Sequence, residues 1–311
     1  MHVASTRLAR VRTFELTPAR FLAIAAAELG ALWLIIATGA AVRLTDSGLG
    51  CRHWPGCEKG HPLPQKDYHA FVEFGNRLVG GVVIVLTLLT WLAARRTRRL
   101  PRWVTRLALA VFLGTLAQAP LGYLAVKSDL RWPVVTAHLL LSMLLVAGAV
   151  LLVVEARGLE VGRAGPLVTG ELRRIALAFT AACLLLLVSG TFATAAGPHS
   201  GGGSHIDRFG TLDTAVYVHA AVVGVFGCVF LFAVGYLAAR RELAPRLFRL
   251  AVGLLVLLLV QMGLGELQWR THLPWGLVLV HVAFAAAVWA GAVAVTALLF
   301  RPPASFAQNR A

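Results

Sequence analysis

Long apolar runs alternate with short polar segments over the whole chain. Eight runs contain about 20 or more residues, and they span 21–42, 71–94, 104–125, 133–155, 173–195, 213–238, 247–268 and 275–300. The apolar core of a bilayer is about 30 Å thick and takes about 20 helical residues to cross. The runs are rich in Gly and Ala and lack the alternation of polar and apolar residues that membrane strands show. We therefore expect an all-α integral membrane protein with eight transmembrane helices.

The eight runs form two sets of four, because the chain contains an internal repeat. Residues 118–138 and 261–281 both begin with Gln, continue with Leu-Gly, contain a neighbouring Trp and Pro, and end with His. The same offset of 143 residues places His219 over Asn76. A duplication at this spacing predicts two pseudo-symmetric four-helix bundles. The predicted segments are a basic tail at 1–20, a first half at 21–156, a linker at 157–172, a second half at 173–300 and a tail at 301–311.

The distribution of charge predicts how the helices are oriented. Only 14% of the residues are charged and 58% are hydrophobic, yet the net charge is +15. With a cytoplasmic N-terminus, 20 of the 29 Lys and Arg residues fall on the cytoplasmic side. This bias is typical of cytoplasmic loops, so we expect both termini in the cytoplasm and a multi-pass protein of a bacterial-type plasma membrane. Nucleic-acid binding is disfavoured, because no soluble segment remains to present a basic face.

Two of the four cysteines lie close together in the first loop, which this orientation places outside the cell. Cys51 and Cys57 bracket the sequence CRHWPGC. Disulfides persist on that side of the membrane, so we expect the two residues to be bridged. The alternative is a metal site that includes His53, although a lone Cys-x5-Cys is not a zinc spacing.

The even-numbered runs carry polar residues at a common depth. These residues are Asn76, His138, His219 and His281, each about five to seven residues after its helix is expected to begin. At 1.5 Å per residue they lie about 8–10 Å below the outer surface. Two imidazoles at one depth on parallel helices match the axial ligation of a b-type haem iron, which predicts this role for His219 and His281. Alternatively, each His hydrogen-bonds a neighbouring carbonyl oxygen.

The first half differs from the second at this depth. Asn76 is not a normal iron ligand, so a haem in this half has at most one axial His from the pair, His138. The first half instead offers Glu73, one turn from Asn76 on the same helix face, where the second half has Val216. A carboxylate in a medium of low dielectric can exchange protons near neutral pH. Arg77 could pair with a haem propionate or with Glu73, and a purely structural ion pair between Glu73 and Arg77 is the alternative.

Other polar residues in or near the runs have less specific interpretations. Gln118 and Gln261 are expected to hydrogen-bond between helices. Glu28 is a candidate functional carboxylate inside its helix, but we favour the interpretation that it reaches headgroup water near the cytoplasmic end. Two tryptophans are expected at the membrane interface, Trp132 and Trp275. The outer-loop arginines that could bind haem propionates are Arg131, Arg208 and Arg270.

Several longer motifs resemble the heme A synthase family. The matching words are GAAVRLTDSGLGC-x-HWPGC, VEFGNRLVGG, TAHLL, the GPHSG loop and the two later His-bearing helices, and the resemblance covers most of residues 20–300. It implies two pseudo-symmetric halves with a b-type haem held between His219 and His281 and a site for heme O in the first half. The family reaction oxidises the C8 methyl group of heme O to the formyl group of heme A, through an alcohol.

The resemblance also implies roles for individual residues of the first half. Glu73 matches the carboxylate that the family needs for activity, His138 a ligand of the substrate haem iron, and Cys51 with Cys57 the outer-loop pair. Asn76 departs from the pattern, because many members have His there. That departure puts ligation of the substrate haem from both faces in doubt and leaves one face of the iron open to an oxidant.

Two other functions remain as alternatives to a heme O oxidoreductase. One is a b-type cytochrome that carries electrons without a substrate of its own, and the other is a transporter, which the lack of broken helices with ionisable midplane sites disfavours. The expected partners are the lipid bilayer, the synthase that supplies heme O, and an unidentified electron donor or acceptor. Homo-oligomerisation is left open.

Overall fold

The architecture is described from a computed structural model of the chain. It describes residues 15–51, 53–54, 56–61, 63–65, 67–165, 167–199, 201–202 and 206–307. The predicted tails at 1–20 and 301–311 therefore lie partly outside the described residues. All eight predicted helices are present, and each is long and apolar enough to cross a membrane. Within the described residues the chain has no β-strand beyond isolated bridges, which confirms the all-α class.

The helices extend a few residues beyond most of the apolar runs. Their bounds are α1 Pro18–Leu44, α2 Tyr68–Arg96, α3 Arg102–Lys127, α4 Trp132–Val161, α5 Gly170–Ala196, α6 Leu212–Ala238, α7 Pro245–Arg270 and α8 Trp275–Phe300, followed by a short 3-10 helix, η1 Ala304–Phe306. Side-chain caps begin three of them: Thr17, Asp67 and Thr169 each accept a hydrogen bond from a backbone N–H of the first turn. The non-helical segment between α4 and α5 is short, at 162–169.

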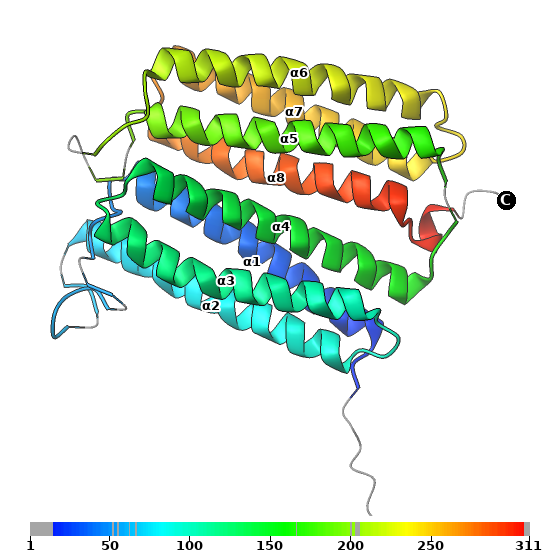
Figure 1. The fold of residues 1–311 in the computed structure, drawn as a ribbon, viewed down its shortest axis with the longest axis horizontal. Helices are drawn as coiled ribbons and strands as arrows, with labels where there is room; N and C mark the ends of the chain where they lie inside the picture. Colours follow the sequence, from blue (N-terminus) through cyan, green and yellow to red (C-terminus); the bar gives the residue numbers. More distant parts are fainter. Residues whose placement is uncertain are drawn as a thin grey trace, which may run out of the picture.

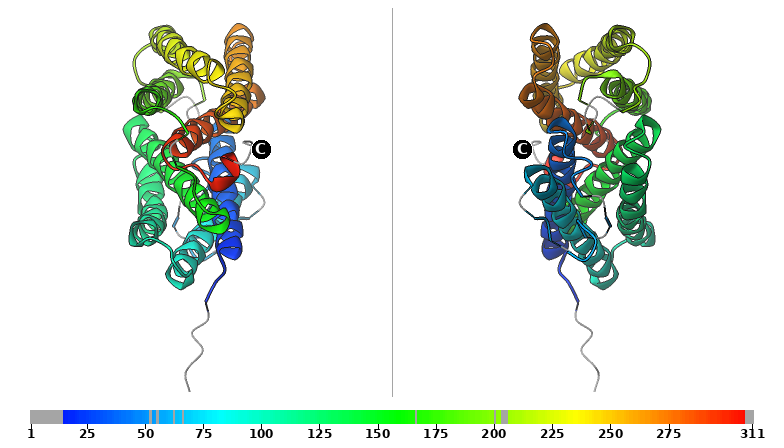
Figure 2. Two further views of the ribbon diagram at one scale, coloured as in Figure 1. Left: turned by 90° about the vertical axis from the view of Figure 1, so that its right-hand side faces the viewer. Right: turned by 90° about the vertical axis from the view of Figure 1, so that its left-hand side faces the viewer.

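Each half is a four-helix bundle in which sequential helices are neighbours and the first packs against the fourth (Figure 1). Seen along the helices, the two bundles lie one above the other (Figure 2). No Cα atom of α2 lies within 8 Å of one in α4, and the same holds for α6 and α8, all of which are fully described. The helices that carry the predicted site residues are therefore diagonal in both bundles.

The seam between the halves consists of α1 and α4 on one side and α5 and α8 on the other. Indole N–H groups bridge it on both flanks of α8. Trp33 on α1 donates to the carbonyl oxygen of Ala283 at 2.9 Å, and Trp289 on α8 donates to that of Met143 at 2.7 Å. The buried core is continuous across the seam, so the two halves form one body.

The turns that connect α3 to α4 and α7 to α8 are the same structure repeated. Asp129 and Leu130 have φ angles of 50° and 57°, and His272 and Leu273 have 62° and 59°. In each turn the second of these residues donates its N–H to the carbonyl five residues earlier, at 2.8 and 2.7 Å. The left-handed conformation is unfavourable for residues with a Cβ, so its recurrence at the 143-residue offset is independent evidence of duplication.

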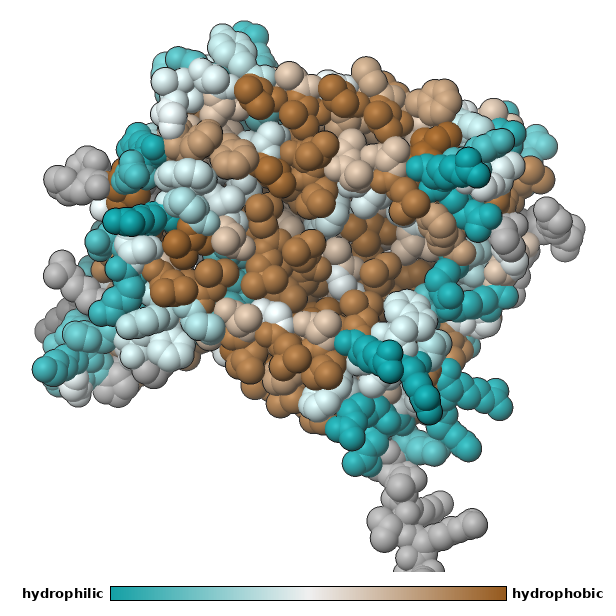
Figure 3. Space-filling view, viewed as in Figure 1, coloured by the Kyte–Doolittle hydropathy of each residue, from teal (hydrophilic) through white to brown (hydrophobic). Residues whose placement is uncertain are grey.

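The surface has an apolar belt between two polar ends (Figure 3). We call the end that carries the loop between α1 and α2 the disulfide end. The opposite end, where the α2–α3 loop, the α6–α7 loop, the start of α1 and the end of α8 lie, is called the basic end. Its arginines are those that the positive-inside rule assigns to the cytoplasm.

Candidate functional site

The four predicted depth residues lie near the disulfide end, at one level of the bundle. Asn76, His138, His219 and His281 lie six to eight residues after the first residue of α2, α4, α6 and α8. That spacing corresponds to about 9–12 Å of helix. The common depth predicted from the sequence is therefore present, with one pair of residues on the diagonal helices of each bundle.

In the second half, helices α5 and α7 shape the surroundings of the two imidazoles. The hydroxyl of Ser189 lies 2.9 Å from Nδ1 of His219, and Nε2 of that ring makes no hydrogen bond among the described residues. A Cβ added to Gly190 would lie 3.2 Å from the Cε1 atom of His219, and one added to Gly265 would lie 3.2 Å from the Cε1 atom of His281. Each ring therefore packs against a glycine of a neighbouring helix.

Glutamines on α3 and α7 make the same hydrogen bond in both halves. Nε2 of Gln118 donates to the carbonyl oxygen of His138 at 3.1 Å, and Nε2 of Gln261 donates to that of His281 at 2.9 Å. This confirms the predicted inter-helix role of both glutamines. In each half the Gln side-chain oxygen and Nδ1 of the His are buried without a partner.

The alternative in which every His donates to a carbonyl oxygen does not hold among the described residues. Nδ1 of His219 lies against a hydroxyl group, and Nδ1 of His138 and of His281 has no partner. Buried polar groups without partners are uncommon and require an explanation. Among the described residues these nitrogens are therefore available to a bound group.

In the first half, Asn76 occupies the position that His219 occupies in the second. Its side-chain oxygen accepts a hydrogen bond from the Thr38 hydroxyl on α1 at 2.8 Å. Thr38 and Gly39 therefore correspond to Ser189 and Gly190 of α5, which hold His219. A Cβ on Gly39 would meet nothing within 4 Å, because the smaller amide leaves space where the second half has an imidazole.

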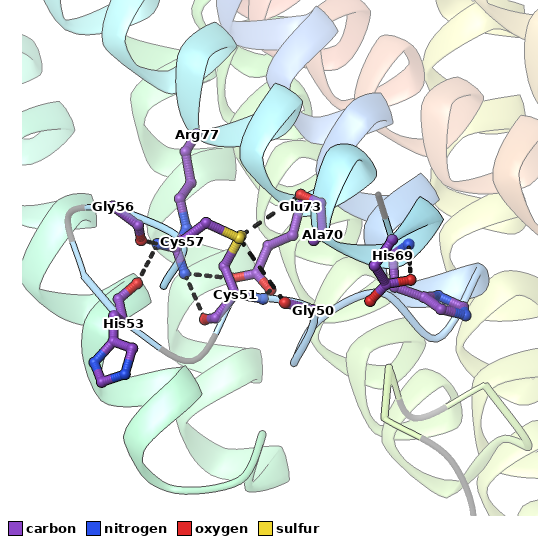
Figure 4. Close-up of a disulfide and its surroundings, with 10 residues drawn as sticks. Gly50, Cys51, His53, Gly56, Cys57, His69, Ala70, Glu73 and Arg77 are labelled. Carbon is purple, nitrogen blue, oxygen red and sulfur yellow. Dashed lines mark hydrogen bonds and ion pairs between the residues drawn. A yellow bond between two sulfur atoms is a disulfide. The ribbon is translucent and has the colours of Figure 1, made fainter. Parts of the chain in front are cut away.

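Glu73 lies where α2 meets the disulfide loop, and its side chain is held from two directions (Figure 4). It is 5% exposed. One carboxylate oxygen accepts the backbone N–H of Cys51 at 2.7 Å, and the other accepts from Arg77 at 2.5 Å. The ion pair predicted as the alternative role of Glu73 and Arg77 is therefore present.

Arg77 also binds the loop itself. Its guanidinium donates to the carbonyl oxygens of Cys51, His53 and Gly56, at 3.0, 2.7 and 2.6 Å. Arg77 thus spans the ring that the Cys51–Cys57 disulfide closes. The alternative of a metal site with His53 is wrong, because both sulfur atoms are joined to each other. No cluster of three or more His, Cys, Asp or Glu side chains occurs in the described part of the chain.

The loop can pack this closely on α2 because of a glycine. A Cβ on Gly50 would lie 2.5 Å from the carbonyl carbon of His69 and 2.7 Å from the backbone nitrogen of Ala70. Only glycine permits this approach of two backbones. The disulfide loop also reaches the second half, where the N–H of Gly48 donates to the carbonyl oxygen of Gly201 at 2.8 Å.

Other polar residues lie in places that the sequence left open or assigned differently. Glu28 is only 1% exposed, so the prediction that it reaches headgroup water is wrong. Of the arginines suggested for propionates, Arg208 donates to the carbonyl oxygen of Pro198 and Arg270 pairs with Glu266.

A pocket between the halves at the disulfide end includes an arginine that the sequence did not single out. Arg43, in the last turn of α1, lines it together with Asp207, Thr136 and Thr191. The Arg43 guanidinium also donates to the carbonyl oxygen of Thr194 on α5. Arg43 therefore links the two halves at the level of the site.

These features define a class of protein: a polytopic membrane protein whose two homologous bundles carry, at one depth, a pair of histidines in one half and a carboxylate, an amide and a single histidine in the other. The family model described as cytochrome oxidase assembly protein matches residues 22–293. The chain belongs to this family.

Three relatives illustrate the range of similarity. The Heme A synthase of Shewanella oneidensis is 26% identical over 319 residues, which cover 88% of this chain and 94% of that protein. That of Symbiobacterium thermophilum is 36% identical over 135 residues, 42% of this chain and 43% of its own length. That of Geobacillus thermodenitrificans is 36% identical over 111 residues, and this match spans 34% of the chain and only 33% of the relative.

Proposed function

We propose that the chain is a heme A synthase, which oxidises the C8 methyl group of heme O to the formyl group of heme A for the assembly of cytochrome oxidase. The observation that carries this proposal is the difference between two otherwise matching halves. In the second half, His219 and His281 lie at the same depth. At that depth the first half instead has Asn76, His138 and a buried carboxylate. One half is suited to hold a haem permanently, and the other to bind a haem that reacts.

The second half fits a b-type haem as a resident cofactor. His219 and His281, each packed against a glycine of a neighbouring helix and carried by the diagonal helices α6 and α8, would hold the haem iron. When bound, such a haem supplies one-electron transfer. Ser189 fixes the ring of His219 through Nδ1 and leaves Nε2 available as the iron ligand.

The first half fits heme O as a substrate bound from one side. His138 is the proposed iron ligand, and Gln118 fixes its backbone carbonyl. Asn76 is occupied by its hydrogen bond with Thr38 and is not a normal ligand, so the opposite face of the porphyrin remains accessible.

Glu73 is the proposed proton acceptor of the reaction. Conversion of a methyl group and one water to a formyl group releases four protons and four electrons, and the electrons pass to an external acceptor. The charge of Arg77 favours the ionised form of the Glu73 carboxylate, which can accept a proton, and the Cys51 N–H fixes its direction. Arg77 is a positioning residue, because it binds the carboxylate and the loop together.

Identification of the bound haems by mass tests the proposed function directly. The purified protein is extracted with acidified solvent, before and after incubation in membranes that contain heme O. Heme b, together with heme O that is converted to heme A, is the expected result. Two haems of unchanged identity would instead indicate a b-type cytochrome, and the absence of any porphyrin would overturn the proposal.

The ligand assignment has its own test in the second half. His219→Ala or His281→Ala is expected to abolish the low-spin b-haem absorption spectrum. The matched control is His272→Ala, in an exposed turn at the same end of the protein, which is expected to leave the spectrum unchanged. A normal spectrum in either ligand variant contradicts the assignment.

A further inference from the structure

A second concave site lies far from the haem level, at the basic end of the first half. It lies where the last turns of α2 meet the first turns of α3, and three arginines line it: Arg95, Arg102 and Arg106. No acidic residue contributes to its lining. Like charges gathered in one concavity repel one another unless an anion binds between them.

Two of the three arginines of this pocket make no contact that holds the fold together. Arg102 and Arg106 are exposed and make no hydrogen bond or ion pair with any described residue. Arg95 packs over the ring of Trp91, with 5.3 Å between the guanidinium carbon and the ring centroid, and Trp91 in turn stacks on Phe112. The aromatic pair fixes one wall of the pocket and one guanidinium, which leaves the charged groups oriented for a ligand.

The corresponding end of the second half is built differently. At the offset of 143 residues Arg95 and Arg102 correspond to Ala238 and Pro245, and only Arg106 has an arginine counterpart, Arg249. The other arginines at this end are engaged elsewhere. Arg240 packs over the ring of Tyr236, at 4.0 Å, and Arg246 donates to the carbonyl oxygen of Ser305. Arg241 and Arg249 remain exposed at the same end of the molecule. The basic pocket is therefore a feature of one half and not a consequence of the duplication.

The pocket is amphipathic along the helix direction. Its arginines lie at the polar edge of the pocket. Leu109 lies seven residues after Arg102 on α3, about 10 Å deeper along the helix than Arg102. Ala94 and Leu100 add to its apolar lining. A small soluble anion would contact only the arginines. A molecule with a phosphate head and an acyl chain can contact both the arginines and the apolar residues.

We propose that this pocket binds the headgroup phosphate of an anionic phospholipid in the membrane leaflet at the basic end. The three guanidinium groups bind the phosphate oxygens, with Arg102 and Arg106 free to form paired hydrogen bonds. The glycerol and the first part of an acyl chain lie against Leu100 and Leu109. Basic pockets between transmembrane helices on the cytoplasmic side are suited to such headgroups.

The test measures lipid retained by the full-length protein. The protein is purified in a neutral detergent and titrated with dioleoyl phosphatidylglycerol or dioleoyl phosphatidylcholine, and the bound lipids are counted by native mass spectrometry. The expected result is selective binding of phosphatidylglycerol by the wild type, weakened about tenfold or more in the double variant Arg102→Gln/Arg106→Gln.

The control removes the same charge from the same end of the molecule. Arg241→Gln/Arg249→Gln is expected to bind phosphatidylglycerol as the wild type does. An equal loss of phosphatidylglycerol binding in both double variants would show that only the overall charge matters. That result would overturn the proposal that this pocket is a lipid site. Unchanged binding in Arg102→Gln/Arg106→Gln would overturn it as well.

A competition experiment distinguishes a lipid headgroup phosphate from a free phosphate ester as the ligand. Soluble glycerol 3-phosphate at millimolar concentration is expected not to displace phosphatidylglycerol, because it lacks the acyl chain that contacts Leu109. Displacement by the soluble ester at concentrations similar to those of the lipid would show that the pocket is a site for a free phosphate ester and would overturn the assignment to a lipid.

Discussion

Glu73 and Arg77 show how a single helical turn can connect a loop to the proposed reaction site. The two residues are an i, i+4 pair on α2, and both also bind the backbone of the disulfide loop. An exposed pair of this kind contributes less than about 1 kcal/mol. Here the carboxylate is buried and accepts two donors, so loss of its charge affects the loop and the site together.

Replacement of Glu73 by Gln is predicted to stop heme A formation while leaving the b-haem in place. The amide keeps the size of the side chain but can no longer accept a proton, and loss of a general base typically costs about 100-fold or more in rate. Heme A is measured by extraction from membranes, and the b-haem by its absorption spectrum.

The control for this variant is Glu266→Gln, which removes a carboxylate from an exposed ion pair with Arg270 at the same end of the protein. It is expected to retain normal heme A formation. A normal rate in Glu73→Gln would exclude Glu73 as the proton acceptor, and loss of the b-haem in that variant would indicate a structural role.

At the scale of single residues, the sequence predicted the conspicuous groups but not the residues that hold them. Asn76, His138, His219 and His281 could be found because they recur at a fixed offset and depth. Thr38 and Ser189 were missed, since a hydroxyl in an apolar helix is not by itself a signal. The signal existed: an ATG at 37–39 and a VSG at 188–190 place a hydroxyl residue before glycine in the first helix of each half.

At the scale of helices, the sequence correctly predicted that eight helices exist and in what order they follow. It predicted the residues at which they end less accurately. An apolar run long enough to span a bilayer specifies a helix almost alone. The end of α4 could not be found in this way, because residues 156–161 are mixed in polarity but still form helix. The helix ends at Gly162, whose φ of 81° favours glycine.

Close helix packing predicts an effect of a valine at Gly265. Its side chain would occupy the volume of the His281 ring, since even a Cβ at this position lies 3.2 Å from Cε1 of that ring. The variant Gly265→Val is expected to lose or shift the low-spin b-haem spectrum. Gly263→Val, on the same helix but with open space around its Cβ, carries the same change in helix propensity and is expected to retain the spectrum.

The repeated turns give a prediction about stability. His272 adopts a φ of 62° in an exposed position, which costs a residue with a Cβ about 1 kcal/mol. His272→Gly is expected to raise the unfolding free energy by about 0.5–1 kcal/mol, measured by thermal unfolding in detergent. His272→Ala keeps the strain and should not stabilise the protein; equal gains in both variants would contradict this explanation.

At the scale of the whole molecule, the halves are joined at both ends as well as along the seam. At the disulfide end, Gly48 bonds to Gly201 and Arg43 to Thr194. At the basic end, Glu155 is 3% exposed and accepts ion pairs from Arg163 of the linker and Arg301 after α8. None of these contacts follows from hydrophobic periodicity, because they join segments more than a hundred residues apart or lie in loops.

Removal of the carboxylate at the basic end is predicted to weaken the joint between the halves. Glu155→Gln leaves two arginines without their counter-charge, and we expect a loss of about 1–3 kcal/mol, reduced from the value for a fully buried pair because both arginines are partly exposed. Thermal unfolding in detergent measures the loss. The control, Glu160→Gln, breaks an exposed pair with Arg157 and is expected to change stability by less than about 0.5 kcal/mol.

The anchoring of Glu73 to a backbone amide inside the Cys51–Cys57 ring has a consequence for biogenesis. A freshly synthesised chain still carries two thiols and an unclosed loop, so its acid has no fixed amide to hold it. Insertion of all eight helices therefore does not complete the protein. Under the role proposed for Glu73, closure of this ring by a thiol oxidant is therefore expected to precede haem conversion.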